Sequence, residues 1–386
     1  MFDFRFSDDA EAFRDEVRAW LATIPAEEYA AHADPGDLTG LDLDIERRLQ
    51  REAGSRGWLS TSLERQAVFN FEAAYADAPL IDTAMTLAGT ALSQFGTGEH
   101  HRALLDLMER GETTFCAAYT EPGAGSDLTR IATTATRTGS GWRIDGVKNL
   151  VTNGHKADWC VTIVRTDPDA APRRAMTMFC IDMRAPGLRV ERPTTMNGWT
   201  LDELAFDGVL VDDSAVLGTV GEGWRQMARA LAAERSGMFW LGFARHALDL
   251  LIDHVTTPSD GVALADDPLV IDEIGRLEAE WSAADRMSRR ALWSQTGAAD
   301  PSIAPAMAKI VATELLVAVA QSASELCGPA GLVWAPLFTT SPPPGAAAGG
   351  RLAWEYLERV HATIGGGANE VHRDAIAHDI FGRGRG

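Results

Sequence analysis

The spacing of hydrophobic residues changes twice along this chain of 386 residues. In 1–112 apolar residues recur about every three or four positions, which predicts helices, as in Phe13, Val17, Trp20, Leu21 and Ile24. In 113–221 they form short runs bounded by glycine and polar residues, which predicts strands. In 222–386 the helical spacing returns. The order predicts an α+β chain with a helical domain, a β domain and a C-terminal helical bundle.

The predicted strands of the middle segment follow one another without helices between them, which favours an antiparallel barrel or sandwich. The segment 138–141 is a compact hairpin signal between two of them. In the last segment, residues 224–254 form a nearly uninterrupted helical pattern. The predicted strands are 115–118, 133–137, 142–145, 159–165, 176–183, 188–192 and 201–211.

The formal net charge of −20 argues against nucleic acid and anionic membrane surfaces as partners. The first residues are too acidic for a signal peptide, and no apolar run is long enough to cross a membrane. No metal-ligand spacing occurs, so no metal site is expected. Buried free thiols in a reducing cytoplasm are expected for the four cysteines, Cys116, Cys160, Cys180 and Cys327.

Two polar segments follow predicted strands and carry the chemistry of the middle segment. The first, Tyr119 to Asp127, contains two glycines that let backbone N–H groups approach a ligand, and hydroxyls at Thr120 and Ser126. The second, Gly146 to Asn153, carries another hydroxyl at Thr152. Either segment alone could be an ordinary polar turn. Together, in this order, they resemble the flavin-binding core of the acyl-CoA dehydrogenases.

That resemblance extends over essentially the whole chain and implies FAD as cofactor and an acyl-CoA thioester as substrate. The family order is also helical, β and helical bundle. The resemblance implies that Thr152 lies near the reactive nitrogen of the flavin, and that Ser126 binds the pyrophosphate and approaches the CoA. The cofactor contacts it implies are Tyr119, Thr120, Gly125, Ser126, Leu150, Val151, Thr152, Ala368 and Glu370.

In this family a carboxylate of raised pKa removes the α-proton of the substrate while the β-hydrogen leaves as hydride. Family members carry that carboxylate at one of two places. The C-terminal place is Gly366 here, which has no side chain and is expected to border the substrate. The other place holds Glu234, followed by Arg235, so we expect Glu234 to be the base and Arg235 to contact the substrate's pantetheine. Glu370 is a competing carboxylate, although it fits the polar face of a terminal helix.

Several positions depart from the usual family pattern. Leu150 stands where the family usually has tryptophan beside the flavin. The segment 256–261 lacks the arginine that reaches a neighbouring subunit's FAD, and Glu325 stands where glutamine is usual. These changes, and the three glycines from Gly365 to Gly367, resemble the heteromeric acyl-CoA dehydrogenases of actinobacterial sterol side-chain degradation.

Four functions follow from this resemblance. The first is α,β-dehydrogenation of an acyl-CoA, with an electron-transfer flavoprotein or similar protein as acceptor. The second is the same reaction on a carrier-protein-bound acyl group. The third, flavin-dependent oxygenation, is disfavoured because Glu234 and the first motif are retained. The fourth is a non-catalytic subunit that completes a partner's flavin site. A homo-oligomer and a hetero-oligomer with a related subunit are both open, and the acyl group is not defined.

Overall fold

The computed structural model describes residues 4–25, 28–29, 43–80, 83–234, 237–259, 261–296 and 303–382. Its helices are α1 (Asp8–Leu21), α3 (Leu43–Ser55), α4 (Leu63–Tyr75), α5 (Thr83–Phe95), α6 (Glu99–Glu109), α7 (Gly223–Glu234), α8 (Met238–Thr256), α9 (Pro268–Thr296), α10 (Ile303–Leu326), α11 (Arg351–Arg359) and α12 (Asn369–Phe381). Its strands are β1 (Phe115–Ala118), β2 (Thr134–Arg137), β3 (Gly141–Val151), β4 (Trp159–Arg165), β5 (Met176–Asp182), β6 (Leu188–Glu191) and β7 (Asp202–Asp212).

Local sequence explains how individual elements begin. The Ser7 side chain accepts a hydrogen bond from the Ala10 N–H and caps α1, whose first turn carries Asp8 and Asp9 near the positive end of the helix dipole. In the β region, β2 and β3 pair as the predicted hairpin, with Thr134 opposite Asp145.

The strands form one seven-stranded sheet in the order β1-β4-β2-β3-β7-β6, with β5 added beside β4. Pairing is antiparallel for β2–β3, β3–β7, β4–β5 and β6–β7, but β4 runs parallel to β1 and to β2. The sheet is therefore mixed, and the expectation of a purely antiparallel β domain was wrong in this respect. The β2–β3 hairpin lies between β1 and β4 in sequence, so β4 returns along β1 in the same direction.

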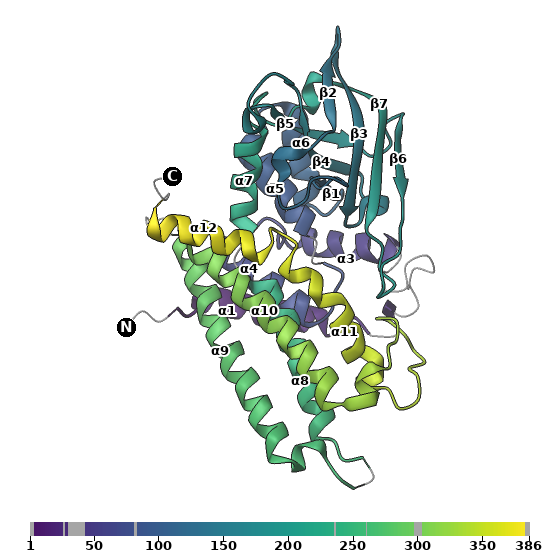
Figure 1. Cartoon of the computed structure of the whole chain (residues 1–386), viewed down its shortest axis with the longest axis vertical. Coiled ribbons are helices and arrows are strands. Elements are labelled where there is room, and N and C mark those ends of the chain that lie inside the picture. Colours follow the sequence, from purple (N-terminus) through teal and green to yellow (C-terminus); the bar gives the residue numbers. More distant parts are fainter. Residues whose placement is uncertain are drawn as a thin grey trace.

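Both faces of the central strand β4 are buried because alternate side chains point to opposite sides of the sheet. Val161 and Ile163 pack against residues of α5, α6 and α7, whereas Cys160 and Val164 pack inside the curl of the sheet with residues of β3 and β7. All four cysteines are buried, and none of them forms a disulfide. Figure 1 shows α5, α6 and α7 gathered on one side of the sheet.

The hydrophobic clusters divide the chain differently from its periodicity. α1, α3 and α4 share a cluster with the C-terminal helices α8, α9 and α10, whereas α5 and α6 pack on the sheet. The division into 1–112, 113–221 and 222–386 stays a prediction. In space, the helices that precede the sheet support both the sheet and the bundle.

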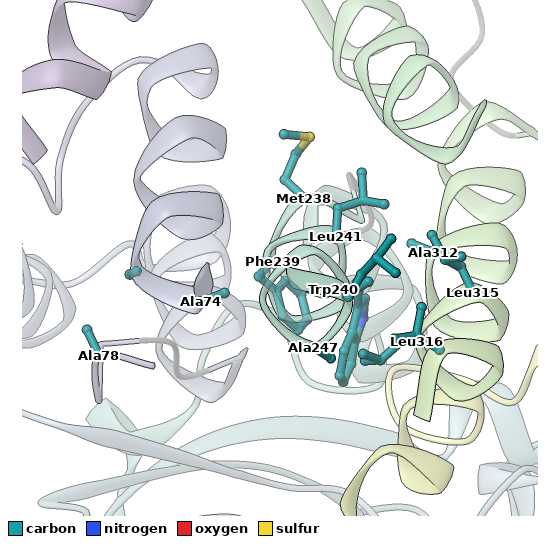
Figure 2. Packing of buried hydrophobic residues seen from close by; sticks show 14 of the residues in the cluster. Ala74, Ala78, Met238, Phe239, Trp240, Leu241, Ala247, Ala312, Leu315 and Leu316 are labelled. Atoms are coloured by element: carbon teal, nitrogen blue, oxygen red, sulfur yellow. The ribbon is translucent and has the colours of Figure 1, made fainter. Parts of the chain in front are cut away.

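Helix α8 is the centre of the bundle. Figure 2 shows its first turns between α4 and α10, with Phe239 toward Ala74 and Trp240 beside Leu316. Met238, Leu241 and Ala247 of the same helix are almost completely buried. The beginning of α8 is thus fixed on two sides by apolar packing.

The predicted helix over 224–254 is wrong as a single element, because the chain forms α7 and α8 with a break between them. Gly237 immediately precedes α8 and has a φ of +77°, a left-handed conformation that glycine adopts without strain. The apolar spacing continues across the break, so the pattern alone does not reveal it.

α10 is the one helix in the described ranges that is long and apolar enough to cross a membrane by length and composition. Most of that apolar stretch is buried inside the protein, where α10 packs against α8, α9, α11 and α12. Its composition fits a helix that is buried within a bundle.

Candidate active site

The two polar segments predicted to bind the flavin lie side by side. The backbone N–H of Asn149 donates a 2.9 Å hydrogen bond to the carbonyl of Thr120, which joins the first segment to the second. In the first segment, backbone hydrogen bonds between Glu121 and Ala124 close a tight turn. An added Cβ at Gly125 would come no closer than 3.9 Å to the Thr120 side chain, so the turn leaves room around its backbone.

A buried ion pair between Lys148 and Glu121 holds these two segments together. The Nζ of Lys148 donates to Glu121 Oε1 at 2.7 Å, to the Tyr119 carbonyl at 3.2 Å and to the Ile163 carbonyl at 2.8 Å. The Lys148 side chain is 0% exposed and that of Glu121 is 5% exposed. Glu121 also accepts a hydrogen bond from the backbone N–H of Thr133 at 3.1 Å. The pair therefore ties β3 to β4 and to the start of the first motif.

The surroundings shift the pKa values of both partners. Burial by itself raises the pKa of Glu121, but the Lys148 ammonium and the Ala132 backbone N–H outweigh it and hold that pKa below its usual value. Burial lowers the pKa of Lys148, and Glu121 offsets part of that change. This pair was not predicted from the sequence, because the predicted strand ends at residue 145, whereas β3 continues to Val151 and carries Lys148.

The second segment ends in a strained turn. Leu150 and Asn153 both have positive φ, +54° and +55°, and they lie on either side of Thr152. Such conformations cost on the order of 1–3 kcal/mol each, less for asparagine than for leucine. Strain of this size persists only where the surrounding structure holds it, and it is concentrated at functional sites.

The same segment fits an isoalloxazine ring. Leu150 is 60% exposed and presents an apolar surface. The Oδ1 of Asn149 is buried, and it has no hydrogen-bond partner in the part of the chain that the structure describes. An FAD ring has apolar faces and an N–H donor, so it would satisfy both features. Thr120 and Thr152 are half-buried beside them, whereas Ser126 is exposed.

Glu234 is the last residue of α7, and its backbone places it at the break before α8. Its side chain and the whole of Arg235 lie outside the described residues. Three residues later, Gly237 packs tightly against α9 and α10. A Cβ there would lie 3.0 Å from Ser288 Oγ and 3.3 Å from the Ala308 carbonyl oxygen.

The three glycines before α12 are held by Lys309, the residue of α10 that follows Ala308. The buried Lys309 donates from Nζ to the carbonyl of Gly367 at 2.9 Å and to Asn369 Oδ1 at 2.8 Å. The ring Nε2 of His372 lies 3.2 Å from the Gly366 carbonyl. Ala308 and Lys309 are adjacent, so a single turn of α10 contacts both the α7–α8 break and the glycine segment. These anchoring residues were not predicted from the sequence.

The remaining predicted residues are less closely tied to this site. Gly366 has a φ of +66°, and a Cβ added to it would meet nothing within 4 Å. Ala368 is the residue before α12, and Glu370 is exposed in its first turn. Among the described residues, no hydrogen bond joins either of them to the Thr120 or Thr152 segments.

Models of known families match two-thirds of the chain. Residues 116–209 match the middle domain of acyl-CoA dehydrogenases, and residues 221–381 match their C-terminal domain. Acyl-CoA dehydrogenase IpdE1 of Mycobacterium tuberculosis is 30% identical, and the match covers 97% of this chain and 98% of that protein. FadE34 of the same organism is 29% identical, but there the chain spans 39% of the relative's length.

Solved structures agree with the sequence comparisons. A structure titled Tcur3481-Tcur3483 steroid ACAD has a TM-score of 0.87 at 26% identity, with all of both chains covered. The ChsE4-ChsE5 complex from Mycobacterium tuberculosis has a TM-score of 0.86 at 25% identity, again over 100% of both chains. Both titles name two different subunits. The chain belongs to the acyl-CoA dehydrogenase family, whose members are FAD-containing oxidoreductases that act on CH–CH bonds.

Proposed function

We propose that this protein converts a saturated acyl-CoA thioester to its α,β-unsaturated form. Glu234 removes the α-proton onto its carboxylate, the β-hydrogen leaves as hydride, and a carbon–carbon double bond forms. Bound FAD supplies the acceptor for that hydride. The observation that carries the proposal is that neighbouring residues of α10 contact two parts of the site. Ala308 lies against Gly237, three residues after Glu234, and Lys309 donates to the carbonyl of Gly367 in the glycine turn.

The chain's own residues have distinct parts in this proposal. Thr120, Leu150 and Thr152, with the backbone of Tyr119, Gly125 and Val151, hold the flavin ring, and Asn149 offers an acceptor beside it. Ser126, exposed on its turn, binds the pyrophosphate and faces the CoA. Ala368 and Glu370 add cofactor contacts from the start of α12, and Arg235 binds the pantetheine arm.

The acyl group in this proposal is large. Gly366 has open space around its Cα, and no side chain there narrows the region next to the glycine turn. Relatives whose structures carry the word steroid in their titles share this fold over the whole chain. A ring-bearing acyl-CoA is therefore the substrate class that we propose.

The proposal is tested by mixing the FAD-loaded protein with acyl-CoAs in the absence of oxygen. We expect a ring-bearing acyl-CoA to bleach the yellow flavin absorbance faster than a straight-chain acyl-CoA does. If an acyl group bound to a carrier protein bleaches the flavin and none of the acyl-CoAs does, the carrier-bound alternative is correct. If none of the thioesters bleaches the flavin, while dithionite does, the proposed reaction is wrong.

We further propose that the active form is a hetero-oligomer in which a related subunit completes the FAD site. The segment 256–261 contains no arginine or lysine. Glu325 accepts a hydrogen bond from Gln321, and its side chain remains exposed. Each charge-assisted contact to a pyrophosphate contributes about 1.5–3 kcal/mol, so losing two weakens FAD binding roughly a hundredfold or more. An electron-transfer flavoprotein is the proposed electron acceptor. The cytoplasm is the proposed location, consistent with four buried cysteines that form no disulfide.

Flavin stoichiometry checks this assembly. The chain expressed alone is expected to lose FAD on gel filtration, whereas a co-expressed related subunit should restore one FAD per pair of chains. The measurement is flavin absorbance per protomer, with mass from light scattering. A fully occupied and active homo-oligomer would contradict the shared-site proposal.

A further inference from the structure

A buried Asp–His pair lies directly behind the turn that carries Thr152. The carboxylate Oδ2 of Asp202 accepts a hydrogen bond from the backbone N–H of His155 at 2.7 Å and lies 2.8 Å from His155 Nδ1. The Asp202 side chain is 0% exposed. Asp202 begins β7 and is the cross-strand partner of Val151, the residue before Thr152.

The pair closes on the strained part of the backbone. Leu150 and Asn153 have left-handed conformations on either side of Thr152, and His155 follows two residues after Asn153. Gly154 packs so closely on the carboxylate that an added Cβ would lie 3.0 Å from Asp202 Oδ2. A single carboxylate oxygen thus receives two hydrogen bonds and makes the close contact that together fix the end of the turn.

Two polar atoms of the pair lack hydrogen-bond partners. This is expected if the pair has a role other than stabilising the fold. Asp202 Oδ1 and His155 Nε2 are both buried, and neither has a hydrogen-bond partner within the described ranges. Buried polar atoms are almost always hydrogen-bonded, and an unsatisfied one reduces stability. An apolar pair of the same shape at this place would avoid that cost but could not hold a backbone N–H.

We propose that Asp202 is a positioning residue for the flavin contact, and that it acts by clamping His155 and thereby holding Thr152 in its strained turn. The clamp fixes the Thr152 hydroxyl at the edge of the flavin, where its hydrogen bond favours the reduced form. This inference rests on the proposed role of Thr152. It assigns Asp202 and His155 no direct contact with FAD or substrate.

The first test needs no flavin chemistry. Amide hydrogen exchange of residues 149–156 is compared in wild type, Asp202→Ala, Asp202→Asn and the control Asp207→Ala. Asp207 lies on the same strand, where its side chain is 70% exposed in an ion pair with Arg189. We expect exchange to be at least about tenfold faster in Asp202→Ala, intermediate in Asp202→Asn, which keeps one acceptor oxygen, and unchanged in the control.

The second test separates positioning from simple stabilisation. With FAD in excess, the ratio of reduced to oxidised bound flavin at a fixed potential is expected to fall about tenfold in Asp202→Ala. That change equals about 30 mV for a two-electron couple. Thr152→Ala should change the ratio in the same direction, and Asp202→Asn should recover part of it.

The outcomes separate this inference from the proposed function. If Asp202→Ala leaves amide exchange over 149–156 unchanged, the clamp is wrong. The clamp is also wrong if Asp202→Ala lowers the melting temperature but leaves the flavin potential unchanged. If Thr152→Ala itself leaves the potential unchanged, the role given to Thr152 is wrong, and the clamp as a device for positioning it falls as well. Substrate bleaching by the wild type, measured separately, decides the dehydrogenase activity.

Discussion

Glu234→Gln is expected to lower the rate of flavin reduction by substrate about 10²–10⁴-fold, because the amide keeps the shape of the side chain but cannot accept the α-proton. FAD occupancy should not change. Glu234 ends α7 at a break whose far side is fixed by α8, and the first turn of α8 is packed between α4 and α10 (Figure 2). A substitution at this position should therefore alter the chemistry without moving the helices. Stopped-flow bleaching with a good substrate measures the effect.

Asp374→Asn is the matched control, since Asp374 is a carboxylate of α12 whose side chain is 75% exposed and to which no role in the site is given. It should leave the reduction rate within about twofold of wild type, as surface substitutions usually have small effects. If Glu234→Gln reduces the flavin at the wild-type rate, Glu234 is not the base. Adding Gly366→Glu to Glu234→Gln then asks whether the other family position can reach the substrate, although its φ of +66° strains any side chain placed there.

The periodic parts of the fold could be predicted from the sequence. Strand β4 occupies the predicted residues 159–165, and α5 lies in the segment 1–112, for which helices were predicted. Each is set by its own local pattern of apolar residues. Direction and partnership were less accessible, because the parallel pairing of β1 with β4 depends on where the intervening hairpin turns back.

The two flavin motifs could be recognised, but the residues that support them could not. Lys148 and Glu121 are separated by 27 positions, and Asp202 and His155 by 47. Each partner taken alone has the features of an ordinary charged residue, and only the folded sheet brings the two together. Buried polar contacts between distant residues depend on packing, to which hydrophobic spacing is insensitive. The break at Gly237 was missed because apolar residues on both sides of it continue a helical pattern.

Lys148→Met is expected to lower the free energy of unfolding by about 3–5 kcal/mol, because it leaves the Glu121 carboxylate buried without its cation. The Tyr119 carbonyl also loses its donor, so the first flavin motif should loosen and FAD should bind more weakly. Urea unfolding of the flavin-free protein measures the stability change, and titration with FAD measures the binding. Arg143→Met on the same strand is the control. Its ion pair with Asp145 is 56% and 40% exposed and should contribute no more than about 1 kcal/mol.

The double variant Lys148→Met/Glu121→Gln separates the charge effect from lost packing. A glutamine at 121 keeps an oxygen for the backbone N–H groups of Ala132 and Thr133 and removes the unpaired charge. It should recover most of the stability lost in Lys148→Met, since a buried neutral pair avoids the desolvation cost.

The pH dependence supplies an independent check of sign. The pKa of Glu121 is lowered in the folded protein from a usual value of 4.5, so the contribution of its carboxylate is fully present above that value. It is lost as the pH falls through the lowered pKa of the folded state. The difference in stability between wild type and Lys148→Met should accordingly shrink as the pH falls into the range where the variant's Glu121 takes up a proton, because the neutral carboxyl no longer needs the Lys148 cation. A difference that stays constant from neutral pH into this range, or a double variant no more stable than Lys148→Met, would show that Lys148 acts through packing rather than through its charge.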